Sequence, residues 1–253
     1  MTTTPIALIT GGSRGLGKAS ALALARAGVD VILTYRDRAD DAQAVVAQIQ
    51  AAGRRAAALQ LDVGESSTFA NFAKAVQSAL QQTWQRASFD YLVNNAGTGL
   101  HKPFAETTED EFDHLMRVHF KGTYFLTQKL LPLIADGGRI VNISSGLARF
   151  SLPGASAYAA MKGAVEVLSR YMAKELGGRR IAVNVIAPGA IETDFNNGAI
   201  RNSPQLQQMI ASQTALGRVG QADDVGGAVA ALLRPETAWI TAQRIEVSGG
   251  MFV

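Results

Sequence analysis

Cysteine is absent from this 253-residue chain, and charged residues make up only 18% of it. Without cysteine there are no disulfides, no thiolate metal ligands and no cysteine nucleophile, and we expect no metal site. The 24 basic and 21 acidic residues give a formal net charge of +3, and no run of five or six like charges occurs. The usual charge pattern of a nucleic-acid or membrane-surface protein is missing, so we expect neither partner.

Long hydrophobic runs are missing as well. No segment reaches the roughly 18 apolar residues that a membrane-spanning helix needs. The first five residues lack a basic region, and the apolar stretch Ile6–Ile9 is too short for the core of a signal peptide. We therefore expect a soluble protein, and a cytoplasmic location fits the composition.

Apolar residues, at 47%, are plentiful enough to build a sizeable core. Short runs rich in β-branched residues alternate with longer segments of helical spacing. Strands are predicted at 6–10, 30–35, 56–61, 91–94, 139–144, 182–187 and 243–247. Helices are predicted at 18–27, 39–52, 68–82, 108–134, 156–176 and 223–233. The alternation predicts one doubly wound α/β domain over 1–253, with a seven-stranded parallel sheet and helices on both faces.

Two local features refine this outline. Thr108 followed by Glu111 is a capping box that predicts the start of the fourth helix. Residues 190–217 break the alternation, with Asn196-Asn197-Gly198 and Ser203-Pro204 inside them. A segment this long between a helix and a strand is typical of an active-site lid, here with a short helix at 205–212.

The first predicted strand runs into TGGSRGLG at 10–17 and then into a helix. Glycines at such a turn let the backbone approach a pyrophosphate, which the helix N-terminus stabilises. A tight turn without a ligand would use the same residues. Residues 12–18 also fit most of a P-loop, but Ala19 stands where Ser or Thr must hold Mg²⁺, so we discount a nucleoside triphosphatase.

The end of the second predicted strand bears on the choice of cofactor. A dinucleotide site places an acid there for NAD, or a cation for the 2′-phosphate of NADP. Arg36 follows the strand, and together with Arg14 of the glycine loop it could clamp that phosphate. NADP is favoured, although Asp37 lies about 20 residues beyond the glycine loop and keeps NAD open.

The residues with the clearest chemical meaning are Tyr158 and Lys162 in the fifth predicted helix. At about 100° per residue, four residues leave their side chains about 40° apart on one face. An ammonium near a phenol lowers the phenol pKa from about 10, toward use as a general acid or base. A tyrosine and a lysine that merely lie side by side on a helix surface, without a catalytic role, would have the same spacing. Ser145 follows the fifth strand, where its hydroxyl could bind a substrate oxygen or form an ordinary turn.

The order of these motifs resembles the short-chain dehydrogenase/reductase family, in its form of about 250 residues, over essentially the whole chain. The matching pieces are TGGSRGLG at 10–17, Asp62-Val63, Asn94-Asn95-Ala96-Gly97, Ser145, YAAMK at 158–162, Asn184, Pro188-Gly189 and Thr193. Each motif alone is modest, whereas the ordered set is specific. The resemblance implies a single Rossmann domain close to the family's 3-oxoacyl reductases.

The family likeness also implies roles for residues of this chain. Tyr158 would exchange a proton with the substrate oxygen, Lys162 would hold the nicotinamide ribose and lower the tyrosine pKa, and Ser145 would orient the carbonyl. Asp62 and Val63 would line the adenine pocket, 95–97 the adenine-side ribose, and 188–193 the nicotinamide. The full set of implied cofactor residues is Gly11, Ser13, Arg14, Gly15, Leu16, Gly17, Arg36, Asp62, Val63, Asn95, Ala96, Gly97, Tyr158, Lys162, Pro188, Gly189, Ile191 and Thr193.

Three positions depart from the family pattern. Val118-His119 stands where the family usually has Val-Asn, whose asparagine helps to hold a water of the proton relay. His119 is either a core histidine or a relay residue, and an ordinary pKa of about 6.5 would make a relay pH-sensitive. Ala242 replaces a common glycine and Ser248 a common aspartate, and both bear only on oligomer packing.

These observations predict an NADP-dependent oxidoreductase that interconverts a ketone or aldehyde and an alcohol. The alternative is a non-catalytic NADP-sensing or scaffold protein with the same fold, for which the His119 substitution is the one supporting feature. The family likeness also implies a homotetramer built through the fourth and fifth helices and the last helix and strand. Oxoacyl thioesters, sugars, steroids and simple ketones all stay open as substrates.

Overall fold

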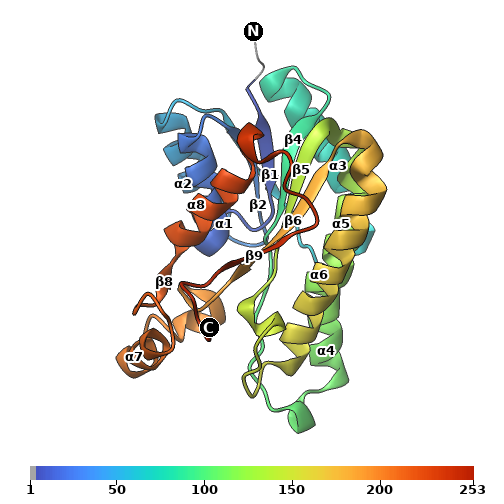
Figure 1. The fold of residues 1–253 in the computed structure, drawn as a ribbon. Helices are drawn as coiled ribbons and strands as arrows, with labels where there is room; N and C mark the ends of the chain where they lie inside the picture. Colours follow the sequence, from blue (N-terminus) through green and yellow to red (C-terminus); the bar gives the residue numbers. More distant parts are fainter. Residues whose placement is uncertain (1–3) are drawn as a thin grey trace.

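Seven parallel strands form the centre of the computed structural model, which describes residues 4–253 (Figure 1). The strands are β1 (Ile6–Ile9), β2 (Asp30–Tyr35), β3 (Ala56–Gln60), β4 (Phe89–Asn94), β5 (Ile134–Ile143), β6 (Ala182–Pro188) and β9 (Arg244–Val247). Their order is β3-β2-β1-β4-β5-β6-β9, so the predicted doubly wound Rossmann sheet is confirmed. The order reverses between β1 and β4, the place where such folds bind ligands.

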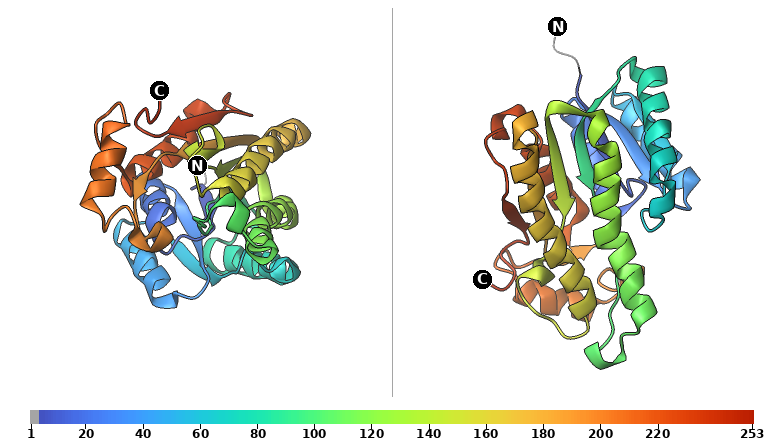
Figure 2. Two further views of the ribbon diagram at one scale, coloured as in Figure 1. Left: turned by 90° about the horizontal axis from the view of Figure 1, so that it is seen from below. Right: turned by 90° about the vertical axis from the view of Figure 1, so that its right-hand side faces the viewer.

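Helices cover both faces of this sheet, as the two views of Figure 2 show. One hydrophobic core joins a face of the sheet to α1 (Gly15–Arg26), α2 (Ala39–Ala51) and α8 (Ala222–Leu232). A second core joins the other face to α3 (Phe69–Ala79), α5 (Gly122–Leu130) and α6 (Ser156–Leu176). Central strands such as β1, whose four residues are all buried, read as continuous apolar runs because both faces are covered.

The fourth predicted helix, at 108–134, is not continuous. It begins as expected, since Thr108 and Glu111 form a reciprocal capping box at α4 (Glu109–Leu115). A π-helical segment at Met116–Lys121 then separates α4 from α5. A 3₁₀ turn at Leu131–Leu133, with Pro132, ends the helical stretch, and β5 starts at Ile134 rather than at 139. Proline ends a helix because it lacks the N–H that the helix would use.

Segment 190–217 lies at the carboxyl end of the sheet, in the lower part of Figure 1. Its predicted short helix is confirmed as α7 (Pro204–Ser212), where the Ser203 hydroxyl accepts a hydrogen bond from the N–H of Leu206. Short strands β7 (Ile191–Glu192) and β8 (Gly220–Gln221) pair at its two ends. Ile210 of this segment forms a small third core with Val219 and Met251. The segment is thereby packed against the C-terminal residues of the chain.

No helix within residues 4–253 combines the length and the apolar character needed to cross a membrane.

Candidate active site

The turn between β1 and α1 is built for close backbone contact. A Cβ at Gly17 would lie 2.1 Å from the carbonyl oxygen of Gly11, and Gly11 and Gly15 both have positive φ. Among the described residues, Arg14 at the N-cap of α1 makes no side-chain cap hydrogen bond. The first N–H groups of the helix are therefore left for an anion such as a pyrophosphate, and the residues present fit a dinucleotide.

Thr10, quoted only as part of the glycine motif, braces this turn. Its hydroxyl accepts hydrogen bonds from the N–H groups of Asn95 and Ala96, both at 2.9 Å. The Asn95 amide in turn donates to the carbonyl of Thr10 at 2.8 Å and to that of Gly11 at 3.2 Å. The ends of β1 and β4 are thus joined, and the Asn95 side chain supports the glycine turn itself. The sequence signal for this role of Thr10 is a polar residue at the end of a buried apolar strand.

Arg36, directly after β2, is engaged with its neighbour. Its Nε donates to Asp37 at 2.6 Å, and both side chains are well exposed. The hydrogen bond with Asp37 is the main cause that raises the pKa of Arg36, and the negative charge of Asp62 acts in the same direction. Asp37 therefore competes for the guanidinium that would bind a phosphate.

Helix α6 places Tyr158 and Lys162 on one face, as the four-residue spacing predicted. The Lys162 Nζ lies 5.6 Å from the centre of the Tyr158 ring and donates to the carbonyl of Ile143, the last residue of β5, at 2.8 Å. Ser145 follows β5 and caps a 3₁₀ turn by accepting a hydrogen bond from the N–H of Leu147. Its hydroxyl is close enough to Tyr158 to act on the pKa of that phenol. The three residues are therefore brought together.

The pKa values of this group differ from the expectation. Burial raises the pKa of Tyr158 to about 12, and the hydrogen bond with Ser145 only partly opposes the rise. Burial also lowers the pKa of Lys162 to about 8. The pKa of Tyr158 is thus raised by burial, and the ammonium of Lys162, 5.6 Å from the ring centre, is not among the causes that shift it.

His119 lies in the π-helical segment with its ring edge against Tyr158, at 5.2 Å between centres. Its Nε2 lies 2.7 Å from the carbonyl of Thr98, which requires the proton on Nε2. Nδ1 is buried without a hydrogen-bond partner in the described part of the chain. Burial, helped by the charge of Lys162, lowers the His119 pKa to about 3. The ring is therefore neutral at physiological pH, and His119 would act without changing charge there, whether as a core histidine or as a relay residue.

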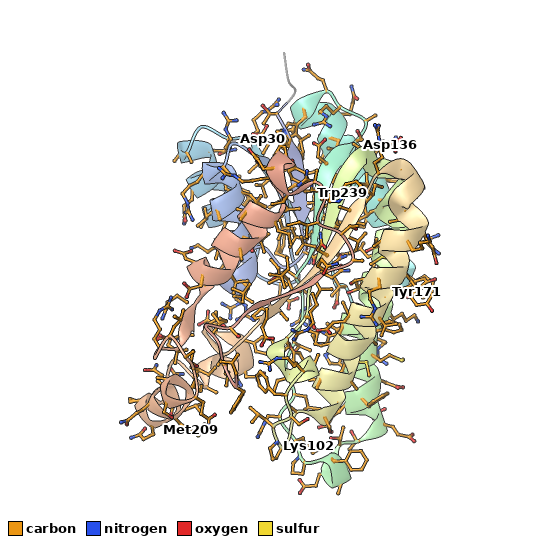
Figure 3. All side chains as sticks on the ribbon, in the orientation of Figure 1. Asp30, Lys102, Asp136, Tyr171, Met209 and Trp239 are labelled. Atoms are coloured by element: carbon orange, nitrogen blue, oxygen red, sulfur yellow. The ribbon has the colours of Figure 1, made fainter. Side chains whose placement is uncertain are left out.

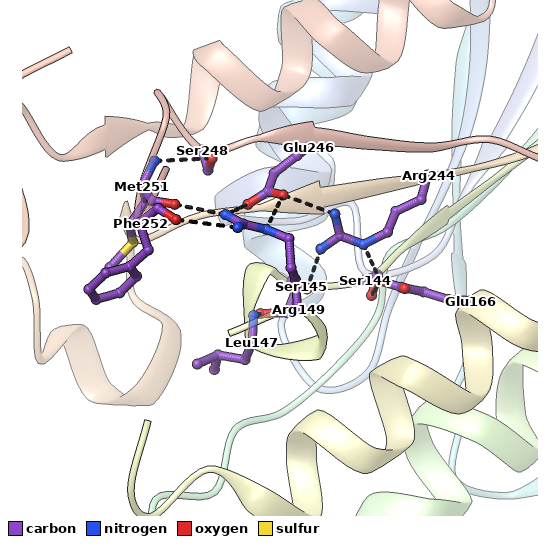
Figure 4. A network of polar contacts seen from close by, with 10 residues as sticks. All are labelled: Ser144, Ser145, Leu147, Arg149, Glu166, Arg244, Glu246, Ser248, Met251 and Phe252. Carbon is purple, nitrogen blue, oxygen red and sulfur yellow. Dashed lines mark hydrogen bonds and ion pairs between the residues drawn. The ribbon is translucent and has the colours of Figure 1, made fainter. Parts of the chain in front are cut away.

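An ion-pair network that the sequence did not predict supports the backbone at Ser145 (Figure 4). The Ser144 hydroxyl donates to Glu166 of α6 at 2.7 Å, and Arg244 of β9 donates to the same carboxylate oxygen at 2.8 Å. Arg244 also donates to the carbonyl of Ser145 at 3.3 Å. These contacts fix the carboxyl end of β5 between α6 and β9.

The same network continues to the end of the chain. Glu246 accepts hydrogen bonds from Arg244 at 3.0 Å and from both sides of the Arg149 guanidinium at 2.7 and 2.9 Å. Burial opposes its charge, but the two arginines outweigh it and lower the Glu246 pKa. Arg149 also donates to the carbonyls of Met251 and Phe252. The C-terminal residues are thereby linked to the turn that carries Ser145.

Behind the site, buried amides and hydroxyls form a second connection that the sequence did not predict. Asn94 of β4 donates to Thr127 of α5 at 3.0 Å and to Asn142 of β5 at 2.8 Å. Asn142 donates to Ser169 of α6 at 2.8 Å. These side chains are almost fully buried, so each needs such a partner.

The residues expected on the nicotinamide side begin with the last residue of β6, Pro188. Gly189 donates its N–H to the carbonyl of Val247, and a Cβ there would lie 2.8 Å from the Cβ of Ser248. The Thr193 hydroxyl accepts from the N–H of Phe195 at 3.2 Å. Asn184, by contrast, braces the strand end by bonding to Ile240 and Gln243. Pro188, Gly189, Ile191 and Thr193 therefore line one path from β6 into segment 190–217.

A sequence model of the family described as enoyl-(acyl carrier protein) reductase matches residues 11–252. The 3-oxoacyl-[acyl-carrier-protein] reductase of Staphylococcus aureus is 36% identical over 255 residues, covering all of both chains. The solved structure of LugOII, a promiscuous reductase that catalyses keto-reduction at C1 during lugdunomycin biosynthesis, has a TM-score of 0.94 at 36% identity and covers 99% of each chain. The angucycline C-6 ketoreductase LanV with bound NADP has a TM-score of 0.93 at 33% identity, over 99% of this chain and 96% of its own.

These matches extend over nearly the whole length of the chain and agree with its fold. The protein belongs to the short-chain dehydrogenase/reductase family and is related to its 3-oxoacyl reductases and ketoreductases.

Proposed function

We propose that the protein is an NADP(H)-dependent carbonyl reductase that converts a ketone or aldehyde to an alcohol, or the reverse. The observation that carries the proposal is the grouping of Tyr158 and Lys162 on one face of α6 beside Ser145, at the carboxyl end of the sheet. The nearby glycine turn and helix N-terminus supply a place for a dinucleotide.

When bound, NADPH would supply a hydride for the carbonyl carbon of the substrate. Ser145 orients the carbonyl oxygen through its hydroxyl. The phenol of Tyr158 donates its proton to that oxygen, and a pKa of about 12 keeps the phenol protonated at neutral pH, the state that reduction needs. Lys162 keeps a positive charge beside the tyrosine and would bind the nicotinamide ribose with the donors that Ile143 does not use.

Arg14 and Arg36 support NADP over NAD, and LanV, a relative of this chain, binds NADP. The implied cofactor residues surround the β1–α1 turn, the ends of β2, β3 and β4, and the path after β6. Segment 190–217 would act as a lid over the substrate. The cytoplasmic location stays an expectation.

Replacing Tyr158 by Phe removes the proton donor and leaves the ring. Turnover of NADPH with carbonyl substrates should fall by about 10²- to 10⁴-fold, the usual contribution of a general acid. NADPH affinity, measured by fluorescence titration, should change little. Near-normal turnover of this variant would contradict the mechanism. NADPH binding by the unmodified protein with no turnover of any carbonyl would favour the sensor alternative.

Replacing Arg36 by Ala should weaken NADPH by about 10- to 100-fold, the loss expected for hydrogen bonds to a charged group, and NADH far less. Asp37→Asn should tighten NADPH, because Arg36 is released from its carboxylate. Arg54→Ala, at the opposite end of the sheet, is the matched control. Equal losses of both cofactors in Arg36→Ala would exclude binding of the 2′-phosphate.

His119→Asn tests the neutral histidine. Since the His119 pKa is about 3, the ring carries no charge between about pH 5 and 8, where an ordinary histidine would titrate. The variant should stay active, and the shape of its kcat/KM profile over that range should match that of the unmodified protein. Loss of a pH-dependent limb near pH 6.5 on substitution would show that His119 does titrate.

A homotetramer is the assembly that the exposed apolar side chains support. Tyr124 and Phe125 on α5, Val167 and Tyr171 on α6, and Trp239 before β9 are all well exposed. Figure 3 shows Tyr171 at the side of the molecule and Trp239 apart from it. The α5–α6 surface and the surface around Trp239 could each contact another copy of the chain. Two different contacts of this kind are what a tetramer with two-fold axes needs.

Light scattering should therefore give the mass of four 26.7 kDa chains. Tyr171→Glu should reduce this mass, because it places a charge on the α5–α6 surface, whereas Gln48→Glu on exposed α2 should not. A monomeric unmodified protein would refute the assembly.

A further inference from the structure

Resting on the proposed carbonyl reduction, we propose that Phe195 is a specificity-determining residue. It selects a neutral, flat aromatic ketone rather than an acyl chain delivered by an acidic carrier protein. Phe195 lies in segment 190–217, outside the seven-stranded sheet and outside the set of implied cofactor residues.

The first observation is the position of the ring. Phe195 lies 6.1 Å from the ring of Tyr158, tilted by 57°, and 43% of it is exposed. His119 meets the same tyrosine at a different angle, edge to face. A carbonyl group at the tyrosine hydroxyl therefore brings the rest of its molecule close to the exposed part of Phe195. Aromatic substrates gain from such a neighbour because rings attract one another in offset and tilted arrangements.

The second observation is that the position of Phe195 is fixed. Its N–H donates to the Thr193 hydroxyl, and the two following residues, Asn196 and Asn197, both have left-handed backbone. A Cβ on Gly99, in the loop after β4, would lie 1.8 Å from the amide oxygen of Asn196. Non-glycine residues hold such a conformation only where their surroundings determine it. The contact of the Asn196 side chain with Gly99 is part of those surroundings, and it helps to hold the neighbouring Phe195 in place.

The third observation is the charge at this end of the molecule. Four cations at the carboxyl end of the sheet are each paired with a carboxylate: Lys102 with Glu111, Arg149 with Glu246, Arg201 with Asp194, and Arg218 with Asp224. Arg117, exposed in the π-helical segment of His119, forms no ion pair within residues 4–253. An acidic protein or phosphate-bearing arm is recognised by cations that are not already neutralised.

Exposed apolar side chains stand among these pairs, including Phe104, Leu152, Met209 and Leu216. Figure 3 shows Met209 and Lys102 on the two sides of this end of the molecule. The surroundings of the site thus offer apolar surface and mostly paired charge, which suits a small neutral ketone.

The test compares three probes with NADPH: 1-tetralone, cyclohexanone as the ketone without the fused aromatic ring, and an acetoacetyl thioester. Phe195→Leu should raise KM for 1-tetralone by about 2- to 10-fold, the size of one aromatic contact, and leave cyclohexanone and kcat nearly unchanged. Phe195→Tyr keeps the ring and should restore the original preference. Equal changes with both ketones, or a preference of the unmodified protein for the thioester over 1-tetralone, would overturn the proposal.

A second variant tests the position of the ring without altering it. Gly99→Ala forces the Asn196 side chain to move and should produce the same selective loss with 1-tetralone. A Gly99→Ala variant that keeps full selectivity would show that the contact of Asn196 with Gly99 does not position Phe195. If the unmodified protein reduces cyclohexanone but none of these variants changes KM for 1-tetralone, this inference alone is refuted. If it reduces none of the three probes, the result also counts against the proposed reductase.

Discussion

A buried ammonium group is the feature on which the rest of this site depends. Lys162 is 5% exposed and bonds to one backbone carbonyl, that of Ile143. A buried charge is costly unless hydrogen bonds hold it, and the cost is visible in the fall of the Lys162 pKa to about 8. The carbonyl must therefore stay in place, which constrains the end of β5.

Two polar networks constrain that point from different directions. On one side, Asn142 of β5 links Asn94 of β4 to Ser169 of α6. On the other, Glu166 and Arg244 hold the backbone at Ser144 and Ser145. Satisfied polar networks of low exposure stiffen what they join, so Lys162, Ser145 and Tyr158 share one rigid frame. Proton donation needs such a frame, because the donor must meet the substrate oxygen within hydrogen-bond distance.

The parts of this frame that the sequence predicts are local in the chain. The spacing of Tyr158 and Lys162, the glycine turn and the Thr108 capping box follow from geometry within a few residues. The missed parts join distant residues: Glu166 and Arg244 are 78 positions apart, and Asn94 and Asn142 are 48 apart. The sequence left open whether His119 lies in the core, and the low pKa follows from the burial that the structure shows. The π-helical segment around His119 had no pattern to predict it.

The residues that carry out the proposed chemistry and the segment proposed to select the substrate are held by different parts of the fold. The two cores on the faces of the sheet hold the catalytic group, whereas segment 190–217 packs on the small core of Ile210, Val219 and Met251. Left-handed Asn196 and Asn197 each cost about 1–3 kcal/mol, which this small core and the contact with Gly99 must offset. Changes in this segment can therefore alter which ketone is accepted while Tyr158 and Lys162 keep their geometry, because the networks that hold them do not pass through it.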